Sequence, residues 1–284
     1  MMKEQKVGDV MVKEVLYAQA PGKKADAIKL LCKHQLSGLP VVKKDTRELV
    51  GIVTRQNIFA HPHEDQLAMI MTKDPVTVRP DTPVKEAAAL MVERHLRRLP
   101  VEKGGELAGM LTCADLLRIV DRMESDQTVE PYLKGPCVPV FEGTPLRVVA
   151  ATFELARAYA LPVVNARARL VGIVTDMDLF SLTSIDSRTV MSSMGLGNDE
   201  DSWNYEGVRN LMRLYYEVSE AELPNVPVKK VMVKDPVTVY RKTSVSKAGR
   251  TMLAHNFRQL PVRDSSDRLR AMLYDTDLIS VLLR

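Results

Sequence analysis

The sequence predicts an α+β protein built from four copies of a β-α-β-β-α unit, and three observations lead to this prediction. The hexapeptide KDPVTV occurs twice, at residues 73–78 and again at 234–239. A Leu-Pro pair recurs four times, at 39–40, 99–100, 161–162 and 260–261. The stretches around these pairs carry strand-like, turn-like and helix-like patterns in the same order. Repetition on this scale determines the architecture before any single motif is interpreted.

The second copy shows why each element of the unit is predicted. The stretch VTVRPDT contains β-branched residues and then a Pro-Asp turn, which predicts a short strand. Thr82 and Pro83 predict a helix N-cap followed by proline at the first helical position. Apolar residues at three- and four-residue spacing over 84–96 mark the buried face of that helix. Residues 99–111 then predict two strands around a Gly-Gly turn, and residues 112–123 predict a second helix.

The domain boundaries follow from these copies. Units of about 60 residues are at the small end of independent stability, so we expect them to pair. The predicted domains are repeat 1 at 1–62, repeat 2 at 66–124, repeat 3 at 127–183, a helical insertion at 184–225, and repeat 4 at 226–284. The insertion holds Trp203, the only tryptophan. Its predicted helix either packs on its own repeat or forms a partner-docking surface or gate.

Composition argues against several functional classes. The formal net charge of +4 is not gathered in one half of the chain, which argues against a nucleic-acid partner. No apolar run approaches the ~18 residues of a membrane span. Scattered cysteines and an N-terminus without a signal-peptide pattern indicate the cytoplasm. The HPHED stretch at 61–65 is interpreted as a polar linker, so no metal is expected, and the absence of catalytic motifs predicts that the chain is not an enzyme.

One motif, T-x-x-D, combines a hydroxyl residue with an acid three positions later. Its four versions span Thr54 to Asn57, Thr112 to Asp115, Thr175 to Asp178, and Tyr274 to Asp277. One interpretation is a capping box that satisfies free amides at a helix start. The other is a nucleotide site, because a helix N-terminus attracts phosphate and a carboxylate can accept two hydrogen bonds from a ribose diol. Taken singly, capping is the commoner explanation for this pattern.

The whole unit, with a Leu-Pro-Val strand followed by G-h-h-T-x-x-D (h, apolar), resembles the CBS domain. Four such domains in one chain are similar to the gamma subunit of AMP-activated protein kinase and its archaeal relatives. The resemblance covers most of the chain. It implies that the repeats form two side-by-side pairs in a flat disc, with nucleotide sites facing the centre, and that the chain regulates rather than catalyses.

The resemblance also implies which residues bind the nucleotide, because the family places each site between two paired repeats. The implied residues are Asp178, Thr175, Ile173, Phe257 and Arg258 at one site; Asp115, Thr112, Met110, Leu36 and Ser37 at a second; Asp277, Met272, Ala158 and Tyr159 at a third; and Asn57, Thr54, Ile52, Leu96 and Arg97 at a fourth. Arg97 and Arg98 match positions that hold phosphate in the family, although both could instead form the solvated cationic end of a helix. Asn57 replaces the family's Asp and Tyr274 replaces a small hydroxyl residue. We therefore expect unequal occupancy, with the Asp178 site filling first.

These observations predict a regulatory module that binds AMP, ADP or ATP as regulatory ligands and signals energy status to an unidentified partner protein. No catalytic cofactor is expected. One alternative is a ligand-independent scaffold in which T-x-x-D serves only as a helix cap. Another is a binder of S-adenosylmethionine-type ligands or of nucleic acid. A homodimer, formed by two stacked discs, is left open.

Overall fold

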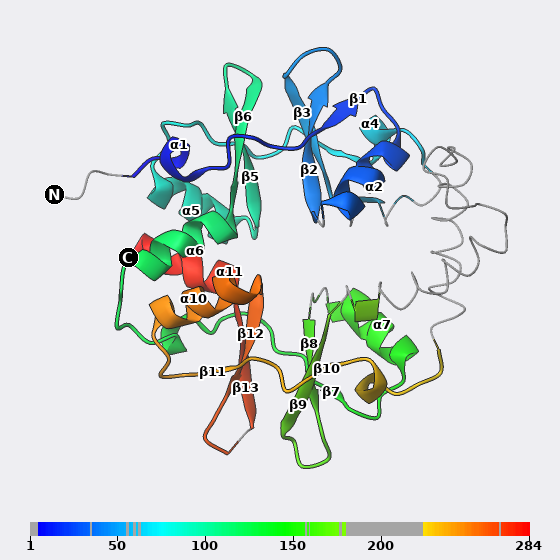
Figure 1. Cartoon of the computed structure of the whole chain (residues 1–284), viewed down its shortest axis with the longest axis vertical. Helices are drawn as coiled ribbons and strands as arrows, with labels where there is room; N and C mark the ends of the chain where they lie inside the picture. The colour runs from blue at the N-terminus through cyan, green and yellow to red at the C-terminus, as the bar shows by residue number, and fades with distance from the viewer. Residues whose placement is uncertain are drawn as a thin grey trace. The chain divides into compact units, whose positions relative to one another are not determined.

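The computed structural model in Figure 1 describes residues 5–34, 36–54, 57–58, 61, 64–156, 158, 160–175, 178–179, 224–266 and 268–284. The described residues divide into two compact units, of which the first ends at Leu116 and the second begins at Leu117. The first unit contains repeat 1 and most of repeat 2. The second contains the end of repeat 2 together with repeats 3 and 4.

Repeat 1 forms a four-stranded sheet. Strand β1 (Ala18–Ala20) runs parallel to β2 (Gly38–Lys43), and β2 pairs antiparallel with β3 (Leu49–Thr54). The fourth strand, β4 (Thr72–Lys73), pairs antiparallel with β3 and comes from the start of repeat 2. Helix α2 (Lys24–Lys33) joins β1 to β2, as expected for a right-handed β-α-β crossover between parallel strands.

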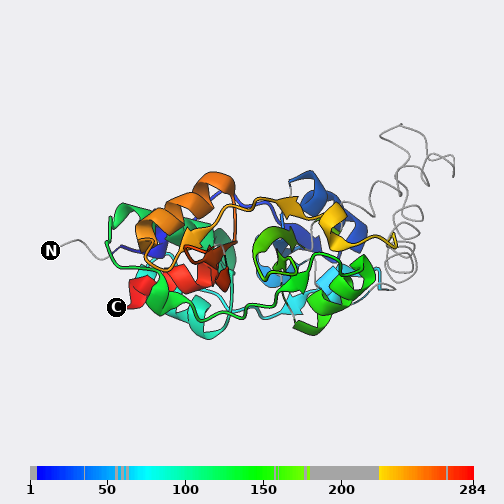
Figure 2. The same cartoon turned by 90° about the horizontal axis from the view of Figure 1, so that it is seen from below.

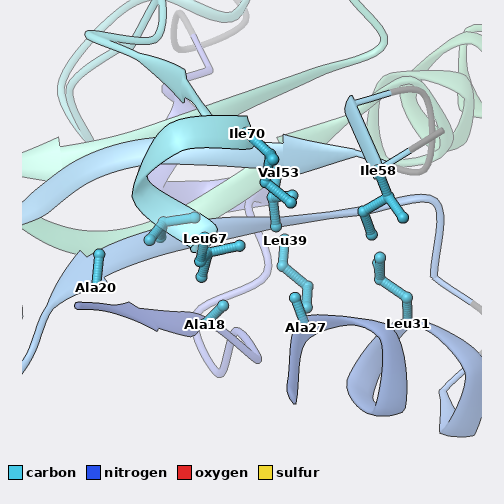
Figure 3. Close-up of a cluster of buried hydrophobic side chains, with 10 residues drawn as sticks. Ala18, Ala20, Ala27, Leu31, Leu39, Val53, Ile58, Leu67 and Ile70 are labelled. Atoms are coloured by element: carbon cyan, nitrogen blue, oxygen red, sulfur yellow. The ribbon is translucent and has the colours of Figure 1, made fainter. Parts of the chain in front are cut away.

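The core of repeat 1 lies between α2, the sheet and a short helix, α4 (Leu67–Ile70). Figure 3 shows that Leu39 of β2 points toward Ala27 of α2, and that Ile58 points toward Leu31. These side chains are almost completely buried. Burying a leucine or isoleucine side chain fully stabilises a fold by about 1.5–3 kcal/mol, so this cluster fixes the angle of α2 on the sheet.

Lys24 breaks the apolar pattern of the helix starts. Its main-chain N–H donates to Asp65 O at 2.8 Å. In each of the other three repeats, the N–H of the first helical residue likewise donates to a main-chain carbonyl. The equivalent residues are Val84, Leu146 and Val245, all of them buried. Lys24 is also buried, its Nζ donates to His61 O at 3.1 Å, and desolvation lowers the pKa of its ammonium group. A lysine therefore occupies a core position in repeat 1.

Repeat 2 has the predicted order of elements, with a shorter first strand than expected. Its helix α5 (Val84–Glu93) is followed by the hairpin of β5 (Arg98–Lys103) and β6 (Glu106–Thr112), and then by α6 (Cys113–Arg122). The predicted strand at VTV is reduced to one parallel bridge, between Val78 and Val101. Pro75 and Pro80 flank the stretch and have no N–H to donate, which limits the ladder.

The predicted N-cap of α5 is wrong by one residue. Pro83, not Thr82, occupies the cap position, with φ −60° and ψ 138°, and no side chain caps the helix. The Thr82 hydroxyl instead accepts from Arg79 N at 3.0 Å, and the Thr82 carbonyl accepts from Val7 N at 2.9 Å. The hydroxyl therefore closes the preceding turn, while the main chain holds the short helix α1 (Val7–Val10).

Repeats 1 and 2 lie side by side in the first unit. Leu49 N donates to Gly105 O at 3.0 Å, and Leu107 N donates to Arg47 O at 2.8 Å. Gly105 lies in the predicted Gly-Gly turn, where both glycines adopt positive φ, 63° at Gly104 and 84° at Gly105. The hairpin of repeat 2 is thus bonded along the edge of the hairpin of repeat 1.

The second unit repeats this arrangement. Its elements are η1 (Glu130–Tyr132), β7 (Val140–Phe141), α7 (Leu146–Ala156), β8 (Ala160–Val164), β9 (Leu170–Thr175), η2 (Val228–Lys230), β10 (Val233–Lys234), β11 (Val239–Tyr240), α10 (Val245–His255), β12 (Gln259–Arg263), β13 (Leu269–Tyr274), α11 (Asp275–Ile279) and η3 (Ser280–Leu283). The strand orders are β10-β9-β8-β7 in repeat 3 and β11-β12-β13 in repeat 4. Repeats 1 and 2 pair through the first unit and repeats 3 and 4 through the second, while the end of α6 belongs to the second unit. The predicted α+β fold of four repeats is confirmed.

Helix α10 packs on the end of α6 and beside α11 in the second unit (Figures 1 and 2). The hydroxyl of Ser246 donates to Val120 O at 3.1 Å and accepts from Ser125 N at 2.8 Å. The main chain of α10 also lies close to α6 at Gly249, where a Cβ would be in ordinary van der Waals contact with Leu117 and Val120. The last turns of repeat 2 are thereby attached to repeat 4.

The predicted helical insertion lies outside the described residues from 184 to 223, including Trp203. Among the residues that the structure describes, no helix is both long and apolar enough to cross a membrane.

Candidate ligand sites between paired repeats

The T-x-x-D motifs do cap the chain where it turns into a helix. The Asp178 Oδ2 atom accepts hydrogen bonds from Thr175 N and from Thr175 Oγ1, both at 2.7 Å. Asp115 Oδ2 accepts the same two bonds from Thr112, at 2.9 and 2.6 Å. The capping interpretation is therefore confirmed for these carboxylates. Both bonds use a single oxygen, so a cap and a ribose contact are chemically compatible.

Asn57 forms the same cap without a charge. Its Oδ1 atom accepts from Thr54 N at 2.9 Å and from Thr54 Oγ1 at 2.6 Å. The Asn57 amide nitrogen donates to Thr72 Oγ1 at 3.3 Å, on the partner repeat. A neutral amide thus reproduces the cap geometry, but its side chain offers one oxygen where a carboxylate offers two.

Each motif lies beside the segment through which the chain enters the partner repeat. We call these the entry segments, at residues 11–16, 71–76, 132–138 and 232–237. Val233 pairs with Ile173 on β9, Thr72 pairs with Ile52 on β3, and Val12 and Met110 exchange two main-chain bonds of 2.9 Å. The motif of one repeat and the entry segment of its partner therefore lie side by side.

This arrangement accounts for the repeated KDPVTV sequence. Asp74 and Asp235 occupy the same place in the two copies and both adopt positive φ, 47° and 49°. Residues other than glycine adopt this conformation uncommonly, and Asp is among those that tolerate it. The two identical segments thus follow the same backbone path past the neighbouring motif.

The entry segments also present apolar side chains to solvent, a feature that sequence analysis missed. Val233 is 51% exposed and Val237 is 36% exposed, on the segment that passes β9. Ile173 on β9 is half-buried. Exposed apolar groups next to a carboxylate suit a ligand with an aromatic base and a hydroxylated sugar. The available signal was the valine that follows Asp-Pro, in a stretch otherwise typical of a turn.

An apolar site residue is predicted two positions before each motif, and its burial differs between repeats. Ile52 and Ile173 are half-buried, whereas Met110 is 7% exposed and Met272 is completely buried. Asp115 is also buried, at 3% exposed. The apolar and acidic groups of the Asp178 motif are thus more accessible than those of the Asp115 motif.

Arg98 links the two repeats of the first unit. Its Nη2 donates to Ser37 Oγ, so these two predicted site residues are in direct contact. Arg98 lies opposite Thr112 in the β5–β6 pair, so the bond to Ser37 forms beside the first residue of the Asp115 motif. The assignment of Ser37 to a ligand site stays a prediction. The guanidinium lies against Gly38, where a Cβ would overlap it and displace the Arg98 side chain. Cys113 N donates to Arg97 O at 3.2 Å, so the Arg97 main chain is attached to the start of α6.

The four predicted residues that precede the Leu-Pro strands share one main-chain arrangement. Each donates its N–H to the carbonyl five positions earlier and so ends its helix, as in a Schellman motif. These residues are Leu36, Leu96, Ala158 and Phe257.

Phe257 is 40% exposed and its ring stacks on His255. Arg258 O accepts from Asp275 N at 2.9 Å, beside the motif of its own repeat. The assignment of Phe257 and Arg258 to the Asp178 site stays a prediction, and Tyr159 lies outside the described residues.

The Tyr274 motif has a distinct electrostatic environment. Asp277 Oδ2 accepts from Tyr274 N at 3.1 Å. Burial raises the pKa of the Asp277 carboxyl to about 6, with a further upward contribution from the charge of Asp275. Hydrogen bonds from the Tyr274 and Gly135 main chains and the charge of Lys134 oppose that shift but do not cancel it. At neutral pH this carboxylate is therefore easier to protonate than an ordinary aspartate.

The HPHED stretch contributes a contact within its repeat. His61 Nδ1 lies 2.9 Å from Asn57 O, and Lys24 Nζ donates to His61 O. Among the described side chains, no group of three or more His, Cys, Asp or Glu residues could hold a metal ion. His63 falls outside that part of the chain.

These features define a tandem-repeat protein in which each capped motif faces the entry segment of a partner repeat. The model of the CBS domain matches residues 7–64, 67–122, 129–184 and 228–284, so this chain belongs to the CBS domain family. Proteins of this family are generally regulatory modules.

Two solved archaeal structures resemble the whole chain. Protein MJ1225 of Methanocaldococcus jannaschii, described as a candidate archaeal homologue of the gamma subunit of AMP-activated protein kinase, matches with a TM-score of 0.76 and 21% identity, covering 98% of this chain and 99% of that chain. An uncharacterised Pyrococcus horikoshii protein matches with a TM-score of 0.68 and 26% identity, covering 98% and 100%. The first likeness shows the four-repeat fold alone.

One curated relative aligns over a much shorter part of the chain. Inosine-5′-monophosphate dehydrogenase of Korarchaeum cryptofilum is 36% identical over 108 residues, which cover 37% of this chain and 22% of the enzyme. The aligned part is thus a small fraction of that enzyme.

Proposed function

We propose that this chain is a regulatory module that binds an adenine nucleotide between paired repeats and passes its occupancy to a partner protein. The observation that carries the proposal is the Asp178 motif. Its carboxylate caps the chain with one oxygen, next to a half-buried isoleucine and an entry segment with exposed valines. A ribose diol can bond the carboxylate while the base lies on the apolar groups.

The same geometry suggests how binding becomes a signal. The motif belongs to repeat 3 and the entry segment to repeat 4, so a bound ligand contacts both repeats of the pair. A ligand that prefers one angle between the repeats shifts the pair toward that angle. A partner that reads the angle then binds with an affinity that depends on the nucleotide. AMP, ADP and ATP are the ligands that we propose for this energy-sensing role.

A scaffold without a ligand is the second candidate function, and the caps themselves favour it. Three of the four motifs make both hydrogen bonds of a helix cap, which would suffice to explain the residues. Solved pairs of CBS domains have been crystallised with AMP and with 5′-methylthioadenosine and S-adenosyl-L-methionine. A decisive ligand panel should therefore contain both types.

Calorimetry and thermal shift with AMP, ADP, ATP, S-adenosylmethionine and an oligonucleotide separate these functions. A true ligand raises the melting temperature because it binds the folded state, and a scaffold shows no rise with any compound. Clean protein should show no IMP oxidation and no nucleotide hydrolysis above background. Robust turnover would overturn the regulatory assignment.

Substitution of the carboxylate tests the site itself. Asp178→Asn should keep the cap, as Asn57 does in repeat 1, but weaken AMP at one site by at least about tenfold, because a charged acceptor bond contributes about 1.5–3 kcal/mol. Asn57→Ala is the matched control and should change the tight sites little. An Asp178→Asn protein that binds every ligand like the parent would show that the site has been misassigned.

A further inference from the structure

The fourth motif, at 274–277, meets its partner repeat differently from the others. Gly51, Gly109 and Gly172 lie three positions before the first residues of the other motifs, close to the main chain of the entry segments, and a Cβ there would overlap an entry-segment methionine. Ala271 takes this position in repeat 4. Among the described residues, β13 is the edge of its sheet and pairs with no entry strand.

The side chain of Tyr274 occupies the space between this motif and the entry segment of repeat 3. Its ring lies against Gly135, so closely that a Cβ on Gly135 would overlap the ring. Its hydroxyl donates to Pro136 O at 2.7 Å. In the other three repeats this position is threonine, which is too short to make either contact.

The carboxylate of this motif is engaged by the same segment. Gly135 N–H donates to Asp277, in addition to the cap bond from Tyr274 N. Met272, which corresponds to the half-buried Ile173 of repeat 3, is completely buried. The apolar residue of this motif is therefore buried, and its partly exposed carboxylate is already bonded to the chain itself.

We propose that Tyr274 closes the fourth site from within by holding Gly135 and Pro136 over Asp277, so that this site excludes the ligand that the Asp178 site accepts. Tyr274 is then a specificity-determining residue that sets the number of ligands per chain. The same contacts fix the entry of repeat 3 against repeat 4 without any ligand. The identity of the excluded ligand rests on the proposed function. The contact of Tyr274 with Gly135 and Pro136 does not depend on it.

Replacing the tyrosine by the residue of the other repeats tests the exclusion. Calorimetry with AMP should find one more site per chain in Tyr274→Thr than in the parent. The double variant Tyr274→Thr, Asp277→Ala should lose the added site. Tyr274→Phe is the matched control, because it keeps the ring, loses only the hydroxyl bond and should add no site. An equal number of sites in the parent and Tyr274→Thr would overturn the proposal.

A second measurement needs no ligand. Cys137 follows Pro136, is only partly exposed, and burial raises the pKa of its thiol. Releasing the segment should speed alkylation of Cys137 by iodoacetamide about fivefold in Tyr274→Thr and less in Tyr274→Phe, as expected for the loss of one or two ordinary contacts. Peptide mass spectrometry gives the rate at each cysteine, with buried Cys113 as the internal reference.

The two measurements separate the failure of this proposal from that of the proposed function. If the parent binds no adenosine compound, the proposed function fails, and alkylation alone decides whether Tyr274 holds the segment. Unchanged Cys137 rates in both variants would overturn the closed contact. If Tyr274→Thr does not fold, the Cys137 rate in Tyr274→Phe decides, because a phenylalanine preserves the packing and removes the bond to Pro136.

Discussion

Replacing Asp277 by asparagine should make the folded chain more stable at neutral pH and flatten part of its pH dependence. The carboxyl has a pKa of about 6 in the folded state, against an ordinary value of 3.8. The folded protein therefore holds this proton more tightly than the unfolded chain. The stabilisation that this provides is present below pH 4 and is lost as the pH rises through 6.

The size of the effect follows from that shift. A difference of about two pKa units corresponds to about 3 kcal/mol of unfolding free energy. The group is partly exposed, so solvent screening reduces this to about 1–2 kcal/mol. Asn57 shows that an amide can accept the cap bonds in the same fold, so Asp277→Asn should keep the cap and remove the ionisation.

Thermal unfolding from pH 4 to pH 8 measures the difference between the two proteins. In a chain of this size, 1–2 kcal/mol corresponds to a melting temperature about 2–8 °C higher for Asp277→Asn at pH 7.5, with a smaller difference near pH 4. Comparing the variants cancels the titration of all other groups. A difference that is independent of pH, or a parent that is the more stable protein at pH 7.5, would refute the reasoning.

Two further predictions concern lysine and arginine side chains. Lys24→Met should be at least as stable as the parent by chemical denaturation, because valine or leucine fills this core position in the other repeats, while Lys24→Ala should be destabilised by the cavity. Arg98→Ala should weaken AMP and ATP more than adenosine in calorimetry, because it removes a cation but no ribose contact. Equal losses for all three ligands would instead indicate that the Arg98 bond to Ser37 only holds the repeats together.

Local chemistry was predictable from the sequence because it repeats. The Gly-Gly turn and the cap between Thr112 and Asp115 depend on residues close in sequence, and their preferences act wherever the pattern occurs. Four copies also made each pattern more specific than any single match. The predicted N-cap at Thr82 was wrong because a distant segment, the helix at Val7, uses the Thr82 carbonyl and extends the main chain there.

The partner of each motif could not be predicted in this way. The pairing of β10 with β9 joins residues about 60 positions apart, and β4 is too short for a periodic signal. The buried Lys24 also has no sequence signal, since a lysine at a helix start normally faces solvent. The flat disc predicted from the family resemblance stays a prediction, which small-angle scattering can test.

The pairing of motif and entry segment has a consequence for how the four sites can differ. Each proposed site combines groups from two repeats, so we expect a substitution in either repeat to change that site while the other proposed sites keep their geometry. Asn57 carries no charge at its motif, and we propose that Tyr274 fills the site at its own, yet both motifs keep the bond that caps the helix. One side-chain oxygen makes the cap bonds and so preserves the fold. The second oxygen and the residues next to the motif can differ from repeat to repeat without loss of the cap. Ligand specificity can therefore diverge among repeats whose backbones stay alike, which is the physical reason to expect unequal sites in one chain.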